Sequence, residues 1–208
     1  MDTPIHVDLL DHIDVKRFAE VAEKVCDIFE HMDDLSEVEF LVGLKERLSL
    51  AYSLAHRLPN PYDWSDDDKG AIEGSVESRL EPRGMSEAEN MERWKDLYQR
   101  IGQKLDTHSH IAFVLDPTDP DERKIVDGEL AEMLAGLYLD LKCGLILYHR
   151  SSDEERAQGL WDWRFGVTHG WGWKFSTAFL PIHSLLQHHY DAIGERWWAD
   201  YKDEEATA

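Results

Sequence analysis

The apolar residues of this chain recur at three- and four-residue spacing through most of its length, which is the spacing of one face of an α-helix. The first stripe predicts a helix over residues 15–32, with Asp14 as its N-cap. The next stripe predicts a helix over residues 41–58, which ends where Pro59 and Pro61 cannot continue it. The front of the chain is therefore expected to form two helices.

The rest of the chain repeats this pattern. Apolar stripes predict helices over residues 87–105 and 121–148, and a fifth helix from residue 153 toward 179 that Pro181 kinks or ends. A last apolar face predicts a helical segment over residues 182–201. Helices thus account for most of the second half of the sequence.

Three of the helix starts carry a capping box, in which a serine is followed three residues later by a glutamate. The pairs are Ser36 with Glu39, Ser86 with Glu89, and Ser152 with Glu155. Residues 59–85 are rich in Asp, Gly and Pro and predict a long irregular connector, while residues 110–115 predict one isolated extended segment. The sequence therefore predicts an all-α, single-domain antiparallel bundle of roughly five to seven helices.

The same patterns divide the chain into three parts. Residues 1–13 form an N-terminal segment, residues 14–185 the helical bundle domain, and residues 186–208 a C-terminal helical extension with an acidic tail. No internal repeat or low-complexity tract interrupts this order.

The charge balance narrows the classes of partner. The chain has 43 acidic and 22 basic residues, for a formal charge of −21, and it therefore repels the phosphates of nucleic acids and anionic lipids. Residues 1–14 lack Lys and Arg and precede no apolar run, so no signal peptide is predicted. Two cysteines at mid-helix positions suit buried thiols in a reducing compartment. We expect a cytoplasmic protein without nucleic-acid or membrane partners.

Motifs for metal binding and catalysis were sought among the polar residues. Eleven histidines occur, but HExxH and the glutamate spacing of di-iron bundles are absent, so neither a metal site nor a cofactor is predicted. No GxSxG or phosphate-binding glycine loop is present, and Cys26 and Cys143 lie where a thiol is poorly activated. These absences favour a protein that is not an enzyme.

Arg164 falls inside the apolar stripe of the predicted fifth helix, where an unpaired charge is costly. One interpretation is a structural ion pair with Asp127, Glu129 or Asp140. The other is a ligand-binding arginine, because a planar guanidinium suits bidentate capture of a carboxylate or phosphate. In that case the site would be lined by further residues of the bundle: Tyr138, Asp140, Trp161 and His169.

Trp163 and Trp173 point away from this stripe. Exposed tryptophan on a charged protein indicates an interface, although burial by another part of the chain is an equal alternative. Gly170 and Gly172 flank Trp171, and two glycines inside a helix predict either close helix packing or a break.

Several of these strings resemble a bacterial family known as domain of unknown function 5063. They are LYLDLKCGL at residues 137–145, LWDWRF at 160–165 and WG at 171–172. The front half, including residues 18–29 and 41–58, is similar to the family as well. The resemblance covers most of residues 14–185 and implies a helical single domain with no established activity.

Two functional hypotheses follow. The first is a non-catalytic interaction or regulatory module in which Trp163 and Trp173 meet a protein partner or a second copy of the chain. The alternative is a small-molecule binding protein or enzyme with an intra-bundle pocket centred on Arg164 that takes an anionic ligand.

Overall fold

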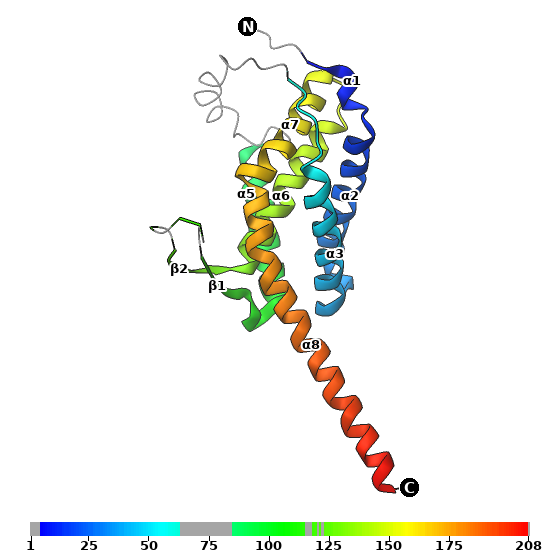
Figure 1. The fold of residues 1–208 in the computed structure, drawn as a ribbon. Coiled ribbons are helices and arrows are strands. Elements are labelled where there is room, and N and C mark those ends of the chain that lie inside the picture. The colour runs from blue at the N-terminus through cyan, green and yellow to red at the C-terminus, as the bar shows by residue number, and fades with distance from the viewer. Residues whose placement is uncertain (1–4, 63–84, 115–117, 120, 122, 208) are drawn as a thin grey trace.

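The predicted fold class is confirmed, because the helices of the chain pack into an all-α bundle (Figure 1). The computed structural model describes residues 5–62, 85–114, 118–119, 121 and 123–207, with side chains up to residue 191. Most of the connector predicted at residues 59–85 lies outside the described residues, as do the side chains of the C-terminal extension from residue 192.

The elements follow one another with short connections where the structure describes them. In the first half they are α1 (Val7–Leu10), α2 (Ile13–Glu30), η1 (Met32–Asp34) and α3 (Glu37–Ala55). In the second half they are α5 (Glu87–Leu105), η3 (Asp106–Ser109), β1 (His110–Val114), β2 (Ile125–Glu129), α6 (Leu130–Tyr148), α7 (Asp153–His169) and α8 (Trp171–Thr207). None of the described helices combines the length and apolar character needed to cross a bilayer.

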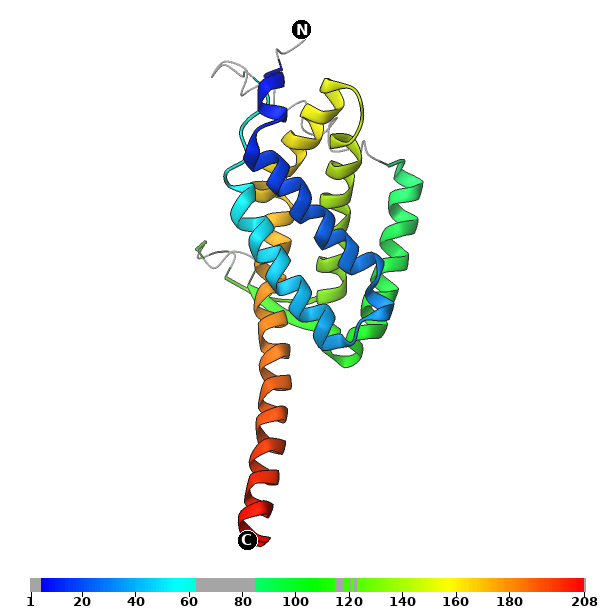
Figure 2. The ribbon, with the colours of Figure 1, turned by 90° about the vertical axis from the view of Figure 1, so that its right-hand side faces the viewer.

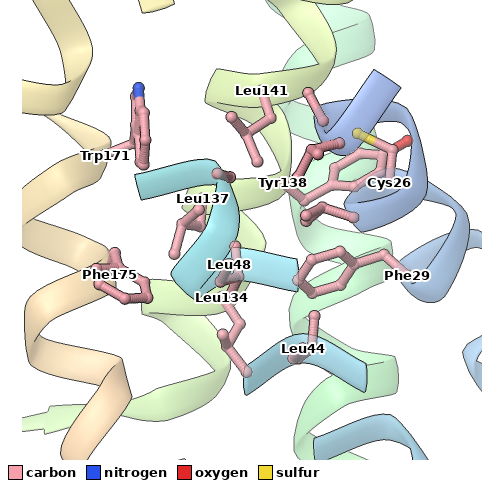
Figure 3. Packing of buried hydrophobic residues seen from close by; sticks show 14 of the residues in the cluster. Cys26, Phe29, Leu44, Leu48, Leu134, Leu137, Tyr138, Leu141, Trp171 and Phe175 are labelled. Atoms are coloured by element: carbon pink, nitrogen blue, oxygen red, sulfur yellow. The ribbon is translucent and has the colours of Figure 1, made fainter. Parts of the chain in front are cut away.

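Helix α6 lies at the centre of the bundle and packs against α2, α5, α7 and α8. Its side chains are buried around most of its circumference, because it is surrounded by other helices (Figure 2). Leu134, Leu137 and Leu141 of α6 lie between residues from α2, α3 and α8 (Figure 3). The apolar stripes of the sequence therefore meet in one continuous core.

The helix caps explain where α3 and α5 begin. Both capping boxes are confirmed, with the serine hydroxyl accepting from the glutamate amide at 3.3 Å in each case. Ser152 caps α7 in the same way, but the side chain of Glu155 pairs with Arg150 instead of completing the box. The prediction that Asp14 caps the first helix is wrong, because the His12 ring accepts from the Asp14 amide and α2 begins at Ile13.

The segment before α6 differs from its prediction. Strand β1 is not isolated but pairs antiparallel with β2, from His110 opposite Glu129 to Val114 opposite Ile125. The predicted helix over residues 121–148 therefore begins only at Leu130. The physical reason is that Ile125, 78% exposed, finds no core to face, and β-branched residues there suit a strand.

The predicted fifth helix is also divided. α7 ends at His169, and α8 begins at Trp171 and continues through Pro181, so no separate helix starts at residue 182. The break follows from close packing at the corner, where a Cβ on Gly172 would lie 1.9 Å from the carbonyl oxygen of Val167. The distal part of α8 projects away from the bundle (Figures 1 and 2).

Candidate functional site

Trp163 is buried within the chain and does not contribute to an exposed surface. Its side chain is 0% exposed, and its indole Nε1 donates to the carbonyl oxygen of Leu141 at 3.2 Å. The indole lies over Gly144, where a Cβ would be only 2.1 Å from Nε1. The assignment of Trp163 to an interface is therefore corrected, because α6 covers it.

Trp173 has a different environment, because the break at Gly170 turns it toward the hairpin. Its side chain is 39% exposed and its indole meets the Phe113 ring edge-to-face at a centroid distance of 5.6 Å. Leu180, two turns further along α8, is 67% exposed. Exposed apolar side chains thus lie where β1 meets α8.

A groove of about 600 Å³ runs between these two elements. Its lining residues are Ile111, Ala112, Phe113, Val114, Trp173, Ser176, Thr177, Leu180, Pro181 and Ser184. Successive side chains of a strand point to opposite faces, so a cavity on one face would contact only alternate residues. Here four successive residues of β1 line the groove, which therefore follows the edge of the strand. The α8 residues recur at three- and four-residue spacing and form one face of that helix.

Two features of the backbone leave hydrogen-bonding groups beside this groove without a backbone partner in the described chain. No backbone hydrogen bond joins residues 111–114 to any described segment other than β2, so one edge of β1 is unpaired within that part of the chain. In α8, Pro181 has no N–H and cannot donate to the carbonyl of Thr177. The groove thus combines apolar side chains with an unpaired strand edge.

Three of the predicted ligand-binding residues lie together in a second cavity. Arg164, Trp161 and His169 of α7 line a space of about 340 Å³, together with His56 at the C-cap of α3 and Asn60 in the segment that follows. The rings of Trp161, Phe165 and His169 stack along α7, with both interplanar angles at 12°. One helix face therefore brings these residues together.

The expected ion pair of Arg164 is not formed with any of its three predicted partners. Its guanidinium donates to the backbone carbonyl of Leu58. Asp140 pairs with Lys174, and Glu129 accepts from the Tyr98 hydroxyl. The prediction took Asp127, Glu129 and Asp140 to belong to an adjacent helix, but Asp127 and Glu129 lie in the β-hairpin.

Asp140 lies in a third cavity, of about 320 Å³, between α5, α6 and α8. Burial raises the pKa of its carboxyl above the ordinary value, and the charge and hydrogen bond of Lys174 oppose this shift. The Lys174 side chain reaches Asp140 by crossing Gly136, where a Cβ would lie 3.1 Å from Nζ. Asp140 is therefore part of an ion pair that joins α6 to α8, separate from the Arg164 cavity.

Tyr138 belongs to yet another cluster. Its hydroxyl donates to Glu30 at 2.8 Å, and Lys142 pairs with the same carboxylate at 2.7 Å. Burial and then the bond to Glu30 raise the pKa of Tyr138. Burial alone would raise the pKa of Glu30, but the bonds from Lys142 and Tyr138 outweigh it and lower that pKa. This cluster ties α6 to α2, and the structure does not bring Tyr138 to Arg164.

The thiols offer little nucleophilic character. Burial raises the pKa of Cys143 to about 12 and that of Cys26 still further. A thiol with such a pKa is protonated at neutral pH and reacts slowly. Among the described residues, no group of three or more His, Cys, Asp or Glu side chains could hold a metal ion.

Sequence reasoning missed the groove and half of the Arg164 cavity. The groove depends on the pairing of β1 with β2 and on the break before α8, neither of which a stripe of apolar residues reveals. The weak alternation around Phe113 was the available signal for the strand. His56 and Asn60 carried no signal, because only tertiary packing brings the end of α3 to α7.

These features define a helical-bundle protein with an appended hairpin. The chain matches the family described as Domain of unknown function (DUF5063) over residues 12–188, and it belongs to that family. Its fold is similar to the crystal structure of protein BF1032 from Bacteroides fragilis, with a TM-score of 0.63 at 17% sequence identity. That similarity covers 85% of this chain and 94% of the other. No curated protein matches the chain.

Proposed function

We propose that this protein is a non-catalytic interaction module that binds an extended segment of a partner protein in the groove between β1 and α8. One observation supports this proposal most strongly: the edge of β1 that is not paired with β2 lies across an apolar groove from one face of α8. An extended peptide that adds to a sheet edge gains main-chain hydrogen bonds, and side-chain pockets beside the edge supply specificity.

The dimensions of the groove suit a short segment. From Trp173 to Ser184, α8 advances by about 16 Å at 1.5 Å per residue. An extended chain covers this length with about five residues at roughly 3.3 Å each. Alternate side chains of such a segment would face the apolar surface of Trp173, Phe113 and Leu180.

Charge favours a cationic partner over a second copy of this chain. No charged side chain is among the described lining residues of the groove, while the whole protein carries −21. Two copies of this charge repel each other, whereas Lys or Arg beside the apolar positions of a peptide is attracted and steered to the surface. The proposed ligand is therefore an apolar segment with basic flanks.

The proposed setting is the cytoplasm. Both cysteines are free and buried, and no disulfide contributes to the described fold. A reducing compartment suits such thiols, which oxidising compartments tend to convert to disulfides.

The test begins with selection of heptapeptides from a random library on the purified protein, followed by fluorescence anisotropy with the best synthetic peptide. We expect alternating apolar residues and basic flanks in the selected sequences. Thr177→Arg fills the middle of the groove and is expected to weaken binding at least about tenfold, a change of about 1.4 kcal/mol.

Gln187→Arg is the matched control, because it adds the same side chain to an exposed position of α8 outside the groove. It is expected to leave the affinity unchanged. The proposal fails if no sequence is enriched, or if both variants bind the selected peptide as the unmodified protein does. If the protein instead self-associates and Thr177→Arg abolishes the self-association, the occupant of the groove is a second copy of the chain and not a peptide.

A further inference from the structure

We infer that the cavity between α7 and the end of α3 binds the carboxylate or phosphate group of a small molecule, with Arg164 as its principal ligand. This site is separate from the groove between β1 and α8, and the two share no lining residue. The inference therefore does not depend on the proposed peptide partner.

Polar side chains make up much of the lining of this cavity. The polar side chains that the structure describes around this cavity are His56, Asn60, Arg164, Thr168 and His169. The N–H groups of His56, Asn60 and Arg164 can donate to a ligand, whereas the Thr168 hydroxyl donates to the Phe165 carbonyl oxygen at 3.0 Å. No carboxylate is among the described lining residues. In a chain with 43 acidic and 22 basic residues, a cavity so lined is complementary to an anion.

The Arg164 guanidinium is only partly used by contacts in the described chain. A guanidinium has five N–H donors, and the Leu58 carbonyl accepts from one nitrogen of this group. Arg164 forms no ion pair with a carboxylate in the described part of the chain. The bond to Leu58 fixes the guanidinium at the cavity wall and leaves other donors for a planar two-oxygen group.

The neighbouring donors are held in place by their own contacts. His56 is the C-cap residue of α3, and its ring meets the Tyr52 ring edge-to-face at a centroid distance of 4.8 Å. Asn60 Oδ1 accepts from the Tyr62 amide at 3.3 Å, which leaves the Asn60 NH₂ as a donor. The His169 ring stacks on the Phe165 ring at a centroid distance of 4.5 Å. Its Nδ1 shares a 2.6 Å hydrogen bond with the Thr168 hydroxyl oxygen. These contacts preorganise the donors.

The volume of the cavity limits the ligand to a small molecule. A volume of about 340 Å³ is at the lower end of the roughly 300–1,000 Å³ typical of small-molecule sites. The stacked rings of Trp161 and Phe165 give the cavity an apolar wall beside its donors. A small metabolite with one anionic group and an apolar body fits this combination.

The test is calorimetric titration with inorganic phosphate and, separately, with malonate, each at an ionic strength matched with sodium chloride. Saturable binding of phosphate alone identifies a phosphate site, and saturable binding of malonate alone identifies a carboxylate site; either supports the inference. Arg164→Lys keeps the positive charge but removes the planar guanidinium that can bind two oxygens at once, and we expect it to weaken binding about tenfold. Arg164→Gln should abolish detectable binding.

Arg47→Gln is the matched control, since it removes one positive charge from an exposed position on α3 away from the cavity. It should retain the affinity of the unmodified protein. If the Arg164 variants do not fold, as judged by circular dichroism, His169→Gln at an exposed position provides the same comparison. The inference is overturned if neither anion binds saturably, or if Arg47→Gln weakens binding as much as the cavity variants do.

Discussion

Contacts of single glycines determine how closely α7 approaches α6. The Trp163 indole occupies the space that a side chain at Gly144 would take, and on the other helix a Cβ at Gly159 would lie 2.7 Å from the Gly144 carbonyl oxygen. Trp163 also contacts the Phe18 ring at a centroid distance of 4.9 Å. A buried tryptophan and two glycines thus fix one helix interface, which explains why these residues occur together.

Gly144→Ala tests this interface at the residue scale. The new methyl group would overlap the Trp163 indole, and overpacking of this kind costs about 1–3 kcal/mol. Urea unfolding followed by circular dichroism should show this loss. Gly102→Ala is the control, because nothing lies within 4 Å of its Cβ and alanine favours a helix by about 1 kcal/mol over glycine. Equal effects of the two changes would contradict the packing described here.

At the scale of elements, the corner between α7 and α8 sets the position of both cavities. It directs Trp173 toward β1 and leaves Arg164 facing the end of α3. The corner depends on Gly172, which approaches the Val167 carbonyl too closely for any side chain. Gly170, by contrast, has space for a methyl group, because its Cβ would meet its nearest atom, the Gly166 carbonyl oxygen, at 3.4 Å.

Gly172→Ala and Gly170→Ala therefore form a matched pair. The first places a methyl group 1.9 Å from a backbone oxygen, so the corner must move, and we expect a loss of at least about 3 kcal/mol in the free energy of unfolding. The second meets its nearest atom at 3.4 Å, an ordinary contact, and should cost less than the first. Thermal and urea unfolding measure both, and a tolerated Gly172→Ala would show that the corner does not require glycine.

The sequence predicted the helices better than their ends. Capping serines marked the starts of α3, α5 and α7, because the cap is a local interaction of a few residues. The hairpin was missed, because the pairing of β1 with β2 is decided by a contact between two separate segments. The break before α8 was one of the two alternatives that Gly170 and Gly172 predicted, and the structure shows both a break and close packing there. Pro181 was predicted to kink or end the helix, and α8 continues through it, because the loss of one hydrogen bond is tolerated inside a helix that packs along the bundle.

The sequence predicted three of the five residues of the Arg164 site and misplaced the other two. Arg164, Trp161 and His169 came together because they share one face of α7, and helical spacing alone places them there. Tyr138 and Asp140 lie in other clusters, since their positions depend on how α6 meets α2 and α8. The two tryptophans proposed for an interface were separated by the corner, which buries Trp163 and leaves Trp173 partly exposed.

At the scale of the whole molecule, an acidic surface surrounds two places that lack acidic lining in the described chain. One is the apolar groove beside β1, and the other is the cavity at Arg164. A net charge of −21 keeps copies of the protein apart and attracts cationic partners over a distance of about 8–10 Å at physiological salt. The charge therefore steers a basic segment toward the molecule, and the groove provides the apolar contacts.

Amide hydrogen exchange of the protein, with and without a saturating selected heptapeptide, tests whether the peptide adds to the edge of β1. Strand addition at the edge of β1 predicts slower exchange at alternate amides within residues 110–114, with little change in α2. Unchanged exchange throughout β1 when the peptide is bound, or protection confined to another face of the bundle, would contradict binding at this edge.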